Sequence, residues 1–323
     1  MRMRRIRNNP ILRSMTAETS LNVKDLIYPL FIIEGENIKK EIPSLPGVYH
    51  FSVDRLEDEI QEIVDLKIPA VILFGVVDHK DSCGSGAYDD NGIIQKACRK
   101  IKEITDDLVV ITDLCMCEYT DHGHCGILDD TGLVDNDKTL NYLSKIAVSQ
   151  AKAGSDVIAP SDMMDLHVAK IRDALDENGF ENIPIMSYAA KFASKYYGPF
   201  RDAAGSSPSF GDRKSYQMDF HNGDEALREI AEDLDEEADF IIVKPGLAYL
   251  DVLARAKDHF NTNFITYNVS GEYAMVLKAI ECGIFDESII MENMIAMKRA
   301  GAKMIITYHA KWLARQLKEG HYA

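Results

Sequence analysis

The sequence has no long hydrophobic run, no secretory leader pattern and no excess of basic charge. No apolar stretch in its 323 residues approaches the roughly 18 residues that span a bilayer, so we expect no membrane segment. Lys and Arg total 36 against 52 for Asp and Glu, a net charge of −16 that disfavours a nucleic-acid-binding protein. We therefore expect a cytoplasmic protein whose six cysteines are reduced thiols or metal ligands rather than disulfides.

Interdomain linkers, internal repeats and low-complexity tracts are also missing from the chain. The simplest division is one catalytic domain, residues 23–323, preceded by an extended arm, residues 1–22, which holds five arginines and no acid before Glu18. Pro10 is expected to interrupt any helix in this arm. A transit peptide and a nucleic-acid-binding arm are alternatives; we favour docking on an acidic surface, such as a neighbouring subunit.

Eight short segments rich in β-branched residues alternate with amphipathic helical patterns. Continuous apolar strands between such helices predict a parallel sheet, and eight units over about 300 residues predict an α/β fold of the (β/α)8 TIM-barrel type. An open doubly wound sheet is the alternative. The predicted strands are residues 26–33, 70–76, 109–114, 156–161, 183–188, 240–245, 264–269 and 304–309, and three of the helical patterns are residues 53–66, 141–154 and 225–238.

Catalytic groups of such a barrel lie past the C-terminal ends of its strands. Polar residues at these ends are Asp113, Ser161, Lys191, Lys244, Ser270 and Tyr308. Lys244 stands in an otherwise apolar strand, where an unpaired lysine is rarely tolerated. Burial and a second nearby cation would depress its pKa and make it a nucleophile that forms a Schiff base with a ketone. A salt-bridged structural lysine is the alternative, and it applies more strongly to Lys191.

Residues 113–126, DLCMCEYTDHGHCG, contain three cysteines and two histidines. Cys115, Cys117 and Cys125 predict a Zn²⁺ site, because thiolates are soft ligands that suit zinc. The fourth ligand could be His122, His124 or a water molecule, and a water would leave a position open for catalysis. A disulfide or inert thiols are the alternative, and solvent-facing loop residues are the alternative for the two histidines.

Two further segments carry functional candidates. The glycine-rich stretch after Lys191 predicts a long mobile loop of the kind that covers an active site, and its Arg201 and Arg213 could clamp carboxylates. Residues 229–239 hold seven acids. A solvated helix face is the expectation there, with a Mg²⁺ site as the alternative.

Eight segments of the chain carry a resemblance to a known family. They are LIYPLFIIEG, DLCMCEYTDHGHCG, APSDMMD, MSYAAKFASKYYGPFRDAAGS, YQMD, VKPGLAYLD, YNVSGEY and IITYHA. Together they resemble the porphobilinogen synthases, also called 5-aminolevulinate dehydratases, over essentially the whole chain. The resemblance implies a (β/α)8 barrel whose arm wraps a partner subunit, usually in a homo-octamer. It also implies condensation of two 5-aminolevulinate molecules to porphobilinogen, with loss of water, in tetrapyrrole and heme biosynthesis.

The resemblance also implies roles for individual residues. Lys244 resembles the Schiff-base lysine of the first substrate, whose carboxylate meets Ser270 and Tyr308. Lys191 resembles the lysine of the second substrate site. The remaining implied roles are carboxylate binding for Arg201, Arg213 and Gln217, contact with the amino group or imine for Asp113 and Ser161, zinc binding for Cys115, Cys117 and Cys125, and allosteric Mg²⁺ binding at a subunit interface for Glu229.

Two rival functions use parts of the same residue set. A Schiff-base aldolase on the same barrel needs one lysine and no three-thiol metal site. A zinc-dependent thiol sensor needs only residues 113–126 and leaves Lys244 inert. A double-imine adduct separates the predicted enzyme from both.

Overall fold

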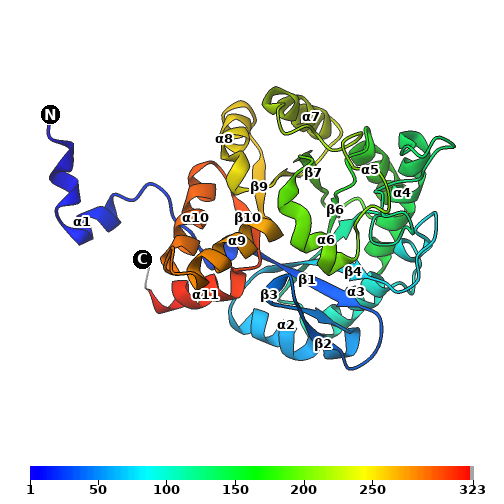
Figure 1. Ribbon diagram of the computed structural model, residues 1–323, viewed down its shortest axis with the longest axis horizontal. Helices are drawn as coiled ribbons and strands as arrows, with labels where there is room; N and C mark the ends of the chain where they lie inside the picture. Colours follow the sequence, from blue (N-terminus) through cyan, green and yellow to red (C-terminus); the bar gives the residue numbers. More distant parts are fainter. Residues whose placement is uncertain (321–323) are drawn as a thin grey trace.

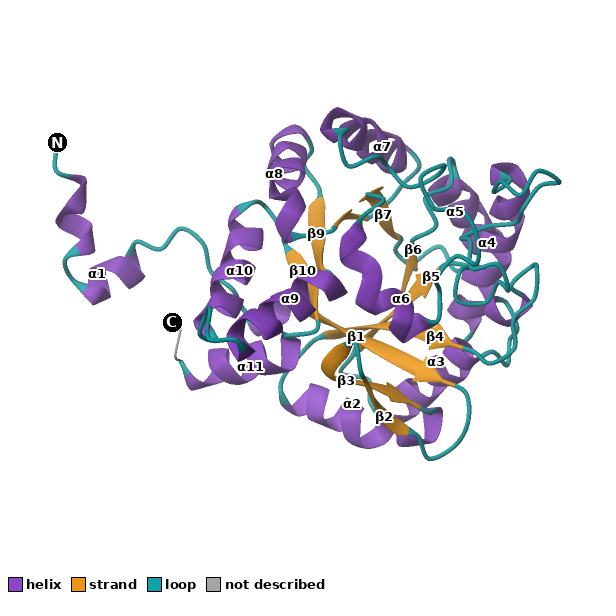
Figure 2. Ribbon diagram, in the orientation of Figure 1, coloured by secondary structure: helices purple, strands orange, loops and turns teal. Residues whose placement is uncertain are grey.

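A computed structural model describes residues 1–320 and places a parallel barrel at the centre of the molecule (Figures 1 and 2). The eight barrel strands alternate with helices, as the sequence predicted. They are β1 (Leu26–Ile33), β4 (Ala70–Val76), β5 (Val109–Leu114), β6 (Val157–Pro160), β7 (Met186–Lys191), β8 (Phe240–Lys244), β9 (Asn263–Asn268) and β10 (Met304–Thr307).

The strands hydrogen-bond in the order β6-β5-β4-β1-β10-β9-β8-β7, and all these pairings are parallel. The two ends of this path meet through a parallel bridge between Ile158 and Ile185, where Ile158 N donates to Pro184 O at 3.1 Å. The sheet is therefore a nearly closed barrel, and the open doubly wound alternative is excluded.

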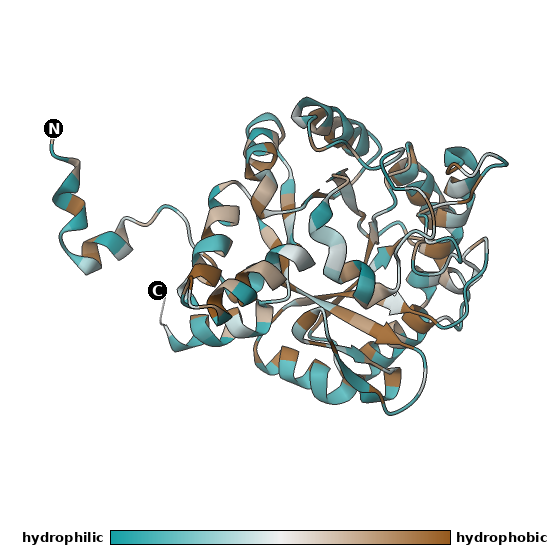
Figure 3. Cartoon of the chain, in the orientation of Figure 1, coloured by the Kyte–Doolittle hydropathy of each residue, from teal (hydrophilic) through white to brown (hydrophobic). Residues whose placement is uncertain are grey.

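Helices surround the barrel, and hydrophilic and hydrophobic residues alternate along them (Figure 3). All three predicted helical patterns form helices, within a few residues at each end. The helices are α1 (Pro10–Met15), α2 (Leu56–Asp65), α3 (Ile93–Ile104), α4 (Asn136–Lys152), α5 (His167–Glu177), α6 (Gly198–Ala204), α7 (Gly223–Asp235), α8 (Leu250–His259), α9 (Ser270–Glu281), α10 (Ser288–Arg299) and α11 (Ala310–Glu319). Among the described helices, none is both long and apolar enough to cross a bilayer.

Alternation along the strands divides the core into two layers. In β8, Ile241 and Val243 pack against the helices, while Ile242 packs inside the barrel. Successive strand residues point to opposite faces, so Lys244 falls on the inner face with Ile242. In β5 the same rule places Asp113 inside with Ile111. Both polar groups thus enter the barrel at the ends of strands that are otherwise apolar.

Strand β7 departs from simple alternation. Ser187 pairs with Ile241 and Ala190 with Val243, so three steps along β7 match two along β8. This β-bulge inserts one residue and reverses the facing of the strand residues beyond it. Ala189 and Ala190 both pack in the outer layer, and Lys191 comes into register beside Lys244. The predicted strand 183–188 was wrong at both ends, because β7 begins at Met186 and ends at Lys191. Lys191 is therefore the last strand residue rather than a residue that follows the strand.

Two other expectations need correction. The segment between β1 and β4 forms a hairpin of β2 (Lys39–Ile42) and β3 (Leu45–Phe51) that the sequence did not predict. Pro10 does not interrupt the arm's helix; it opens α1, since proline fits the first turn, where no backbone N–H is needed. Figure 1 shows the arm projecting away from the barrel. Its boundary at residue 22 stays a prediction.

Candidate active site

The two predicted lysines lie side by side at the C-terminal end of the barrel. Lys191 and Lys244 are register partners on β7 and β8, and their residues are only 5% and 6% exposed. Both amines stand over the Tyr188 ring, with Nζ to ring-centroid distances of 5.6 Å for Lys191 and 5.0 Å for Lys244. The chain thus brings two buried amines into one cavity.

Lys244 is surrounded by aromatic rings. Its Nζ lies 4.5 Å from the Tyr267 centroid and 5.2 Å from those of Tyr197 and Phe200. Burial, followed by the positive charge of Lys191, lowers the pKa of Lys244 to about 7. A substantial fraction of this amine is therefore neutral and nucleophilic at neutral pH, and it has no salt-bridge partner among the described residues.

Lys191 has a different environment. Its Nζ donates a hydrogen bond to the backbone carbonyl of Ser161, which follows β6. Burial opposes the charged form, but the sulfurs of Cys125, Cys115 and Cys117 and the carboxylate of Asp113 outweigh it and raise the pKa of Lys191. Two lysines on adjacent strands therefore have pKa values displaced in opposite directions.

Two carboxylates line the same cavity. Asp113 accepts a hydrogen bond from Ser161 Oγ at 3.0 Å, and burial together with the charge of Glu118 raises the pKa of Asp113 to about 7. Glu118 is 3% exposed, lines the cavity with both lysines and lies 3.2 Å from Cys117 Sγ. Glu118 was not among the residues predicted from the sequence. Its position directly after Cys117 was the available signal.

The three predicted cysteine ligands converge. The sulfurs of Cys115, Cys117 and Cys125 lie within 4.8 Å of one another, all three residues are buried, and none forms a disulfide. Hydrogen bonds from Cys115 and Cys117 hold the pKa of Cys125 well below its ordinary value, so the cluster already favours a thiolate. Soft thiolates at this separation could hold a metal ion, and the donor set suits zinc.

A solvent-facing position was the alternative for the two histidines of the same loop, and the structure excludes it. His122 is 8% exposed and His124 is 4% exposed. His124 contacts Tyr216 Oη through Nδ1 and the Phe210 carbonyl through Nε2, both at 3.1 Å. Neither ring joins the three-sulfur cluster among the described residues. The histidines instead pack the cysteine loop against residues 206–216.

A set of unpaired polar groups lies on the segment that follows β7. Arg201 Nε, Arg213 Nε and both amide atoms of Gln217 are buried and lack a hydrogen-bond partner among the described residues. Arg213 uses its Nη2 to bind the carbonyls of Gly123 and Ser206. Arg201 and Arg213 line the cavity with the lysines, whereas Gln217 lines a neighbouring one. Buried donors without acceptors are costly, so an anionic group is the natural occupant here.

The segment after Lys191 covers the cavity, and it is more ordered than the predicted loop because it contains α6. Phe200 N donates to Ser270 Oγ at 2.9 Å, Ser44 Oγ to the Pro199 carbonyl at 3.1 Å, and Lys80 Nζ to the Gly205 carbonyl at 2.6 Å. The cavity between the lysines has a volume of about 20 Å³, which holds about one water molecule. This cavity is therefore too small to hold a substrate molecule in this conformation of the segment.

The segment that follows Lys191 and covers the cavity, here called the cover, packs closely against the cysteine loop at Gly123. Its φ of +70° is a left-handed conformation that favours glycine, and a Cβ there would lie 2.4 Å from the Ser207 carbonyl oxygen. The cover therefore rests directly on the backbone beside the cysteines.

Ser270 and Tyr308 lie on the side of Lys244 away from the cysteines. Ser270 begins α9 and contacts the cover through the backbone of Phe200. Tyr308 Oη lies 3.0 Å from Tyr267 Oη, and the Tyr267 ring in turn contacts Lys244. Neither residue lines the small cavity between the lysines, although Ser270 contacts Phe200, which does.

Glu229 lies apart from this centre, on α7. Burial and the charges of Asp233, Asp165 and Glu225 raise the pKa of Glu229 to about 7. It lines a cavity of about 470 Å³ together with Asp165 and Gln217. Among the described residues these acids do not form a compact ligand cluster like that of the cysteines.

Known proteins resemble the chain along its full length. Residues 1–316 match the family model for delta-aminolevulinic acid dehydratase. The enzyme of that name from Bacillus subtilis is 54% identical over 319 residues, 98% of each chain, and that from Staphylococcus aureus is 55% identical over 318 residues, again 98% of each. A crystal structure of the Toxoplasma gondii enzyme, in complex with the reaction product porphobilinogen, superimposes with a TM-score of 0.97 at 40% identity, covering 99% of this chain and 92% of that one. The chain therefore belongs to the delta-aminolevulinic acid dehydratase, or porphobilinogen synthase, family.

Proposed function

We propose that this protein is a lyase that condenses two molecules of 5-aminolevulinate to porphobilinogen, with loss of water, in tetrapyrrole and heme biosynthesis. The observation that carries the proposal is the register pairing of Lys191 with Lys244 in one buried cavity beside three cysteines. Each substrate molecule has a ketone, an amine and a carboxylate. The cavity offers a separate amine for each ketone.

Lys244 is the proposed nucleophile for the ketone of the first substrate. Its pKa of about 7 supplies the neutral amine that attack requires, and the rings around it exclude water from the imine that forms. A protonated imine withdraws electrons from the adjacent carbon. That carbon can then lose a proton and form the new carbon–carbon bond.

Lys191 is the proposed partner of the second ketone. Its amine donates to the Ser161 carbonyl and lines one cavity with Cys117, and the Asp113–Ser161 pair lines the same cavity. These two polar side chains can bind the amino group or imine of the second substrate. The function thus uses both lysines, whereas an aldolase would use one.

The carboxylates of the two substrates have separate proposed binding groups. The unpaired donors of Arg201, Arg213 and Gln217 suit the carboxylate of the second substrate. Ser270 and Tyr308 are proposed for the carboxylate of the first, since they flank the Lys244 side of the site. Opening of the segment that carries Phe200 would free Ser270 Oγ for this role.

Cys115, Cys117 and Cys125 are the proposed ligands of a zinc ion. When bound, zinc would supply a Lewis acid for the second substrate and offset the thiolate charge that holds the Lys191 proton. The buried, closely spaced and disulfide-free sulfurs support this assignment. Magnesium at Glu229 is proposed as an allosteric ion, supported by the surrounding carboxylates that raise the Glu229 pKa.

We further propose a cytoplasmic homo-oligomer, most simply an octamer, without nucleic-acid or membrane partners. The arm supports assembly, because it exposes six large apolar side chains: Met1, Met3, Ile6, Ile11, Leu12 and Met15. Its arginines could meet an acidic face of a neighbouring copy.

The test is incubation with 5-aminolevulinate, borohydride reduction and mapping of adducts by mass spectrometry, alongside a colorimetric assay for porphobilinogen. We expect product formation and labelling of Lys244. Labelling of one lysine with cleavage of an aldol substrate would instead support an aldolase. An unlabelled Lys244 in zinc-replete protein, with no product, would reject the proposal and leave the thiol sensor.

A further inference from the structure

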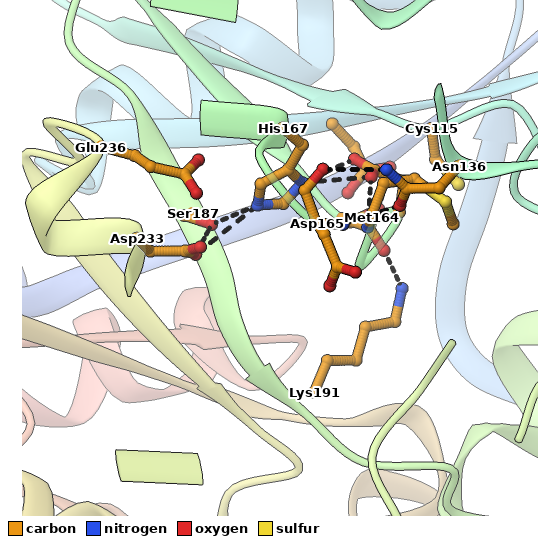
Figure 4. Close-up of polar contacts among 12 residues, drawn as sticks. Cys115, Asn136, Met164, Asp165, His167, Ser187, Lys191, Asp233 and Glu236 are labelled. Atoms are coloured by element: carbon orange, nitrogen blue, oxygen red, sulfur yellow. Dashed lines mark hydrogen bonds and ion pairs between the residues drawn. The ribbon is translucent and has the colours of Figure 1, made fainter. Parts of the chain in front are cut away.

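A buried polar network joins His167 to Ser187 of β7 and to Asp233 (Figure 4). Ser187 faces the outside of the barrel, because its neighbours Met186 and Tyr188 pack inside it. The centre of the network is His167, the first residue of α5 and 2% exposed. His167 Nδ1 contacts both carboxylate oxygens of Asp162, at 3.1 and 3.0 Å. Its Nε2 lies 3.1 Å from Ser187 Oγ and 3.5 Å from Asp233 Oδ2. One imidazole thus joins two acids that come from different elements.

Both ends of this network reach the surroundings of Lys191. Asp162 is fully buried and directly follows Ser161, whose carbonyl accepts the Lys191 hydrogen bond. Ser187 is also fully buried, stands at the start of the β7 bulge and donates a hydrogen bond to Asp233. The bulge is what turns Lys191 into the barrel. His167 therefore contacts both β7, which carries the Lys191 amine, and the loop after β6, whose Ser161 carbonyl accepts the hydrogen bond from that amine.

The loop from Asp162 to His167 would not hold its shape unaided. Met163 and Leu166 have φ values of 69° and 65°, a left-handed conformation that side chains other than glycine rarely adopt. Met164 N donates to Asp162 Oδ1 at 2.8 Å, and Asp165 N donates to Asn136 Oδ1 at the same distance. Such strain persists only where the surroundings impose it.

We infer that His167 is a positioning residue for Lys191: by bridging Asp162 to Ser187 and Asp233, it fixes the β7 bulge and the loop after β6 that together aim the Lys191 amine. The role rests on the proposed function, because it serves the second Schiff base. Burial alone would lower the pKa of His167, but the charges of Asp162 and Asp233 outweigh it and raise that pKa well above the ordinary value. The imidazole thus donates from both nitrogens.

The test uses the full-length protein with His167→Gln, which keeps a polar side chain but cannot donate in two opposite directions. The probe is 4-oxopentanoate, a ketone acid that lacks the substrate's amine, trapped with borohydride and quantified at each lysine. We expect the ratio of Lys191 to Lys244 adduct to fall at least tenfold. The kcat for 5-aminolevulinate should fall at least tenfold and KM should change less than about threefold, because the carboxylate-binding groups are untouched.

Asp25→Asn is the matched control. Asp25 is also a buried acid that accepts a backbone N–H, from Asn22 at 3.0 Å, and pairs with one cation, Lys298 at 3.1 Å, but it lies before β1. It should lower the melting temperature without changing the adduct ratio. Ser187→Ala, a smaller change than His167→Gln, should shift the ratio in the same direction and keeps the test open if the Gln variant does not fold.

An unchanged adduct ratio in His167→Gln, or in Ser187→Ala where the first variant does not fold, overturns the inference. A parent protein that makes porphobilinogen without any Lys191 adduct also overturns it, because no Lys191 reactivity then needs positioning. A parent protein that makes no porphobilinogen and traps nothing at Lys244 rejects the proposed function itself. The two failures are therefore distinguishable.

Discussion

The depressed pKa of Lys244 gives the sharpest prediction. An ordinary lysine pKa is 10.5, and burial with the Lys191 charge brings that of Lys244 to about 7. The difference corresponds to about 5 kcal/mol in favour of the neutral amine. Only the neutral form attacks a ketone, so imine formation at Lys244 should be near its maximum above pH 7. It should fall about tenfold for each pH unit below that value.

Lys191→Met isolates the contribution of the neighbouring charge. The two Nζ atoms lie 5.6 and 5.0 Å from the same Tyr188 centroid, so they cannot be further apart than about 11 Å. At that limit, and with an effective dielectric constant of about 20, a like charge costs about 1.5 kcal/mol. Removing it should raise the pKa of Lys244 by at least about one pH unit.

The assay is borohydride trapping of 4-oxopentanoate on Lys244, quantified by peptide mass spectrometry across a pH series. The parent protein should show a midpoint near pH 7, and Lys191→Met a higher one. Lys195→Met is the control, because it removes an exposed lysine from the segment that follows Lys191. It should leave the midpoint of Lys244 trapping unchanged. A parent midpoint near 10.5, or a variant midpoint equal to or below that of the parent, would refute the electrostatic reasoning.

Three further outcomes are expected. Cys125→Ala should lose bound zinc and activity together, as measured by elemental analysis and product assay; activity that persists without metal would rule out the zinc role. Arg213→Lys should raise KM for 5-aminolevulinate about tenfold or more, because lysine lacks the Nε–H donor that is unpaired in Arg213, and an unchanged KM would remove Arg213 from carboxylate binding. Lys311→Met should lower the free energy of unfolding by about 3 kcal/mol in denaturant titrations, because the buried carboxylate of Glu59, with a side chain 1% exposed, would lose its closest cation. Lys278→Met, which breaks the exposed ion pair with Glu281, is the control and should cost far less.

The sequence by itself narrowed the architecture to a parallel sheet covered by helices, with a (β/α)8 barrel favoured over an open doubly wound sheet, and it identified the main candidate site residues. Apolar strands alternating with amphipathic helices predict a parallel sheet covered on both faces, and eight such units favour a barrel, but only the bridge between Ile158 and Ile185 shows that the sheet closes. Lys244 was identifiable because it is a charged residue at the end of an otherwise apolar strand. The three cysteines were identifiable because they lie within eleven residues of one another in the sequence. These signals are local. Each depends on residues close together in the chain, so no distant contact was needed to recognise them.

The tertiary structure decided which way the second lysine points and what surrounds it. The sequence does not reveal the bulge between Ser187 and Ala190, since an extra residue in a ladder depends on the partner strand β8. Nor does it reveal that His122 and His124 are buried, because that burial comes from residues 206–216 folding over the cysteine loop. Long-range packing therefore determined the pKa values of the two lysines and the direction in which their amines point. The local sequence pattern indicated the strands and helices that carry them.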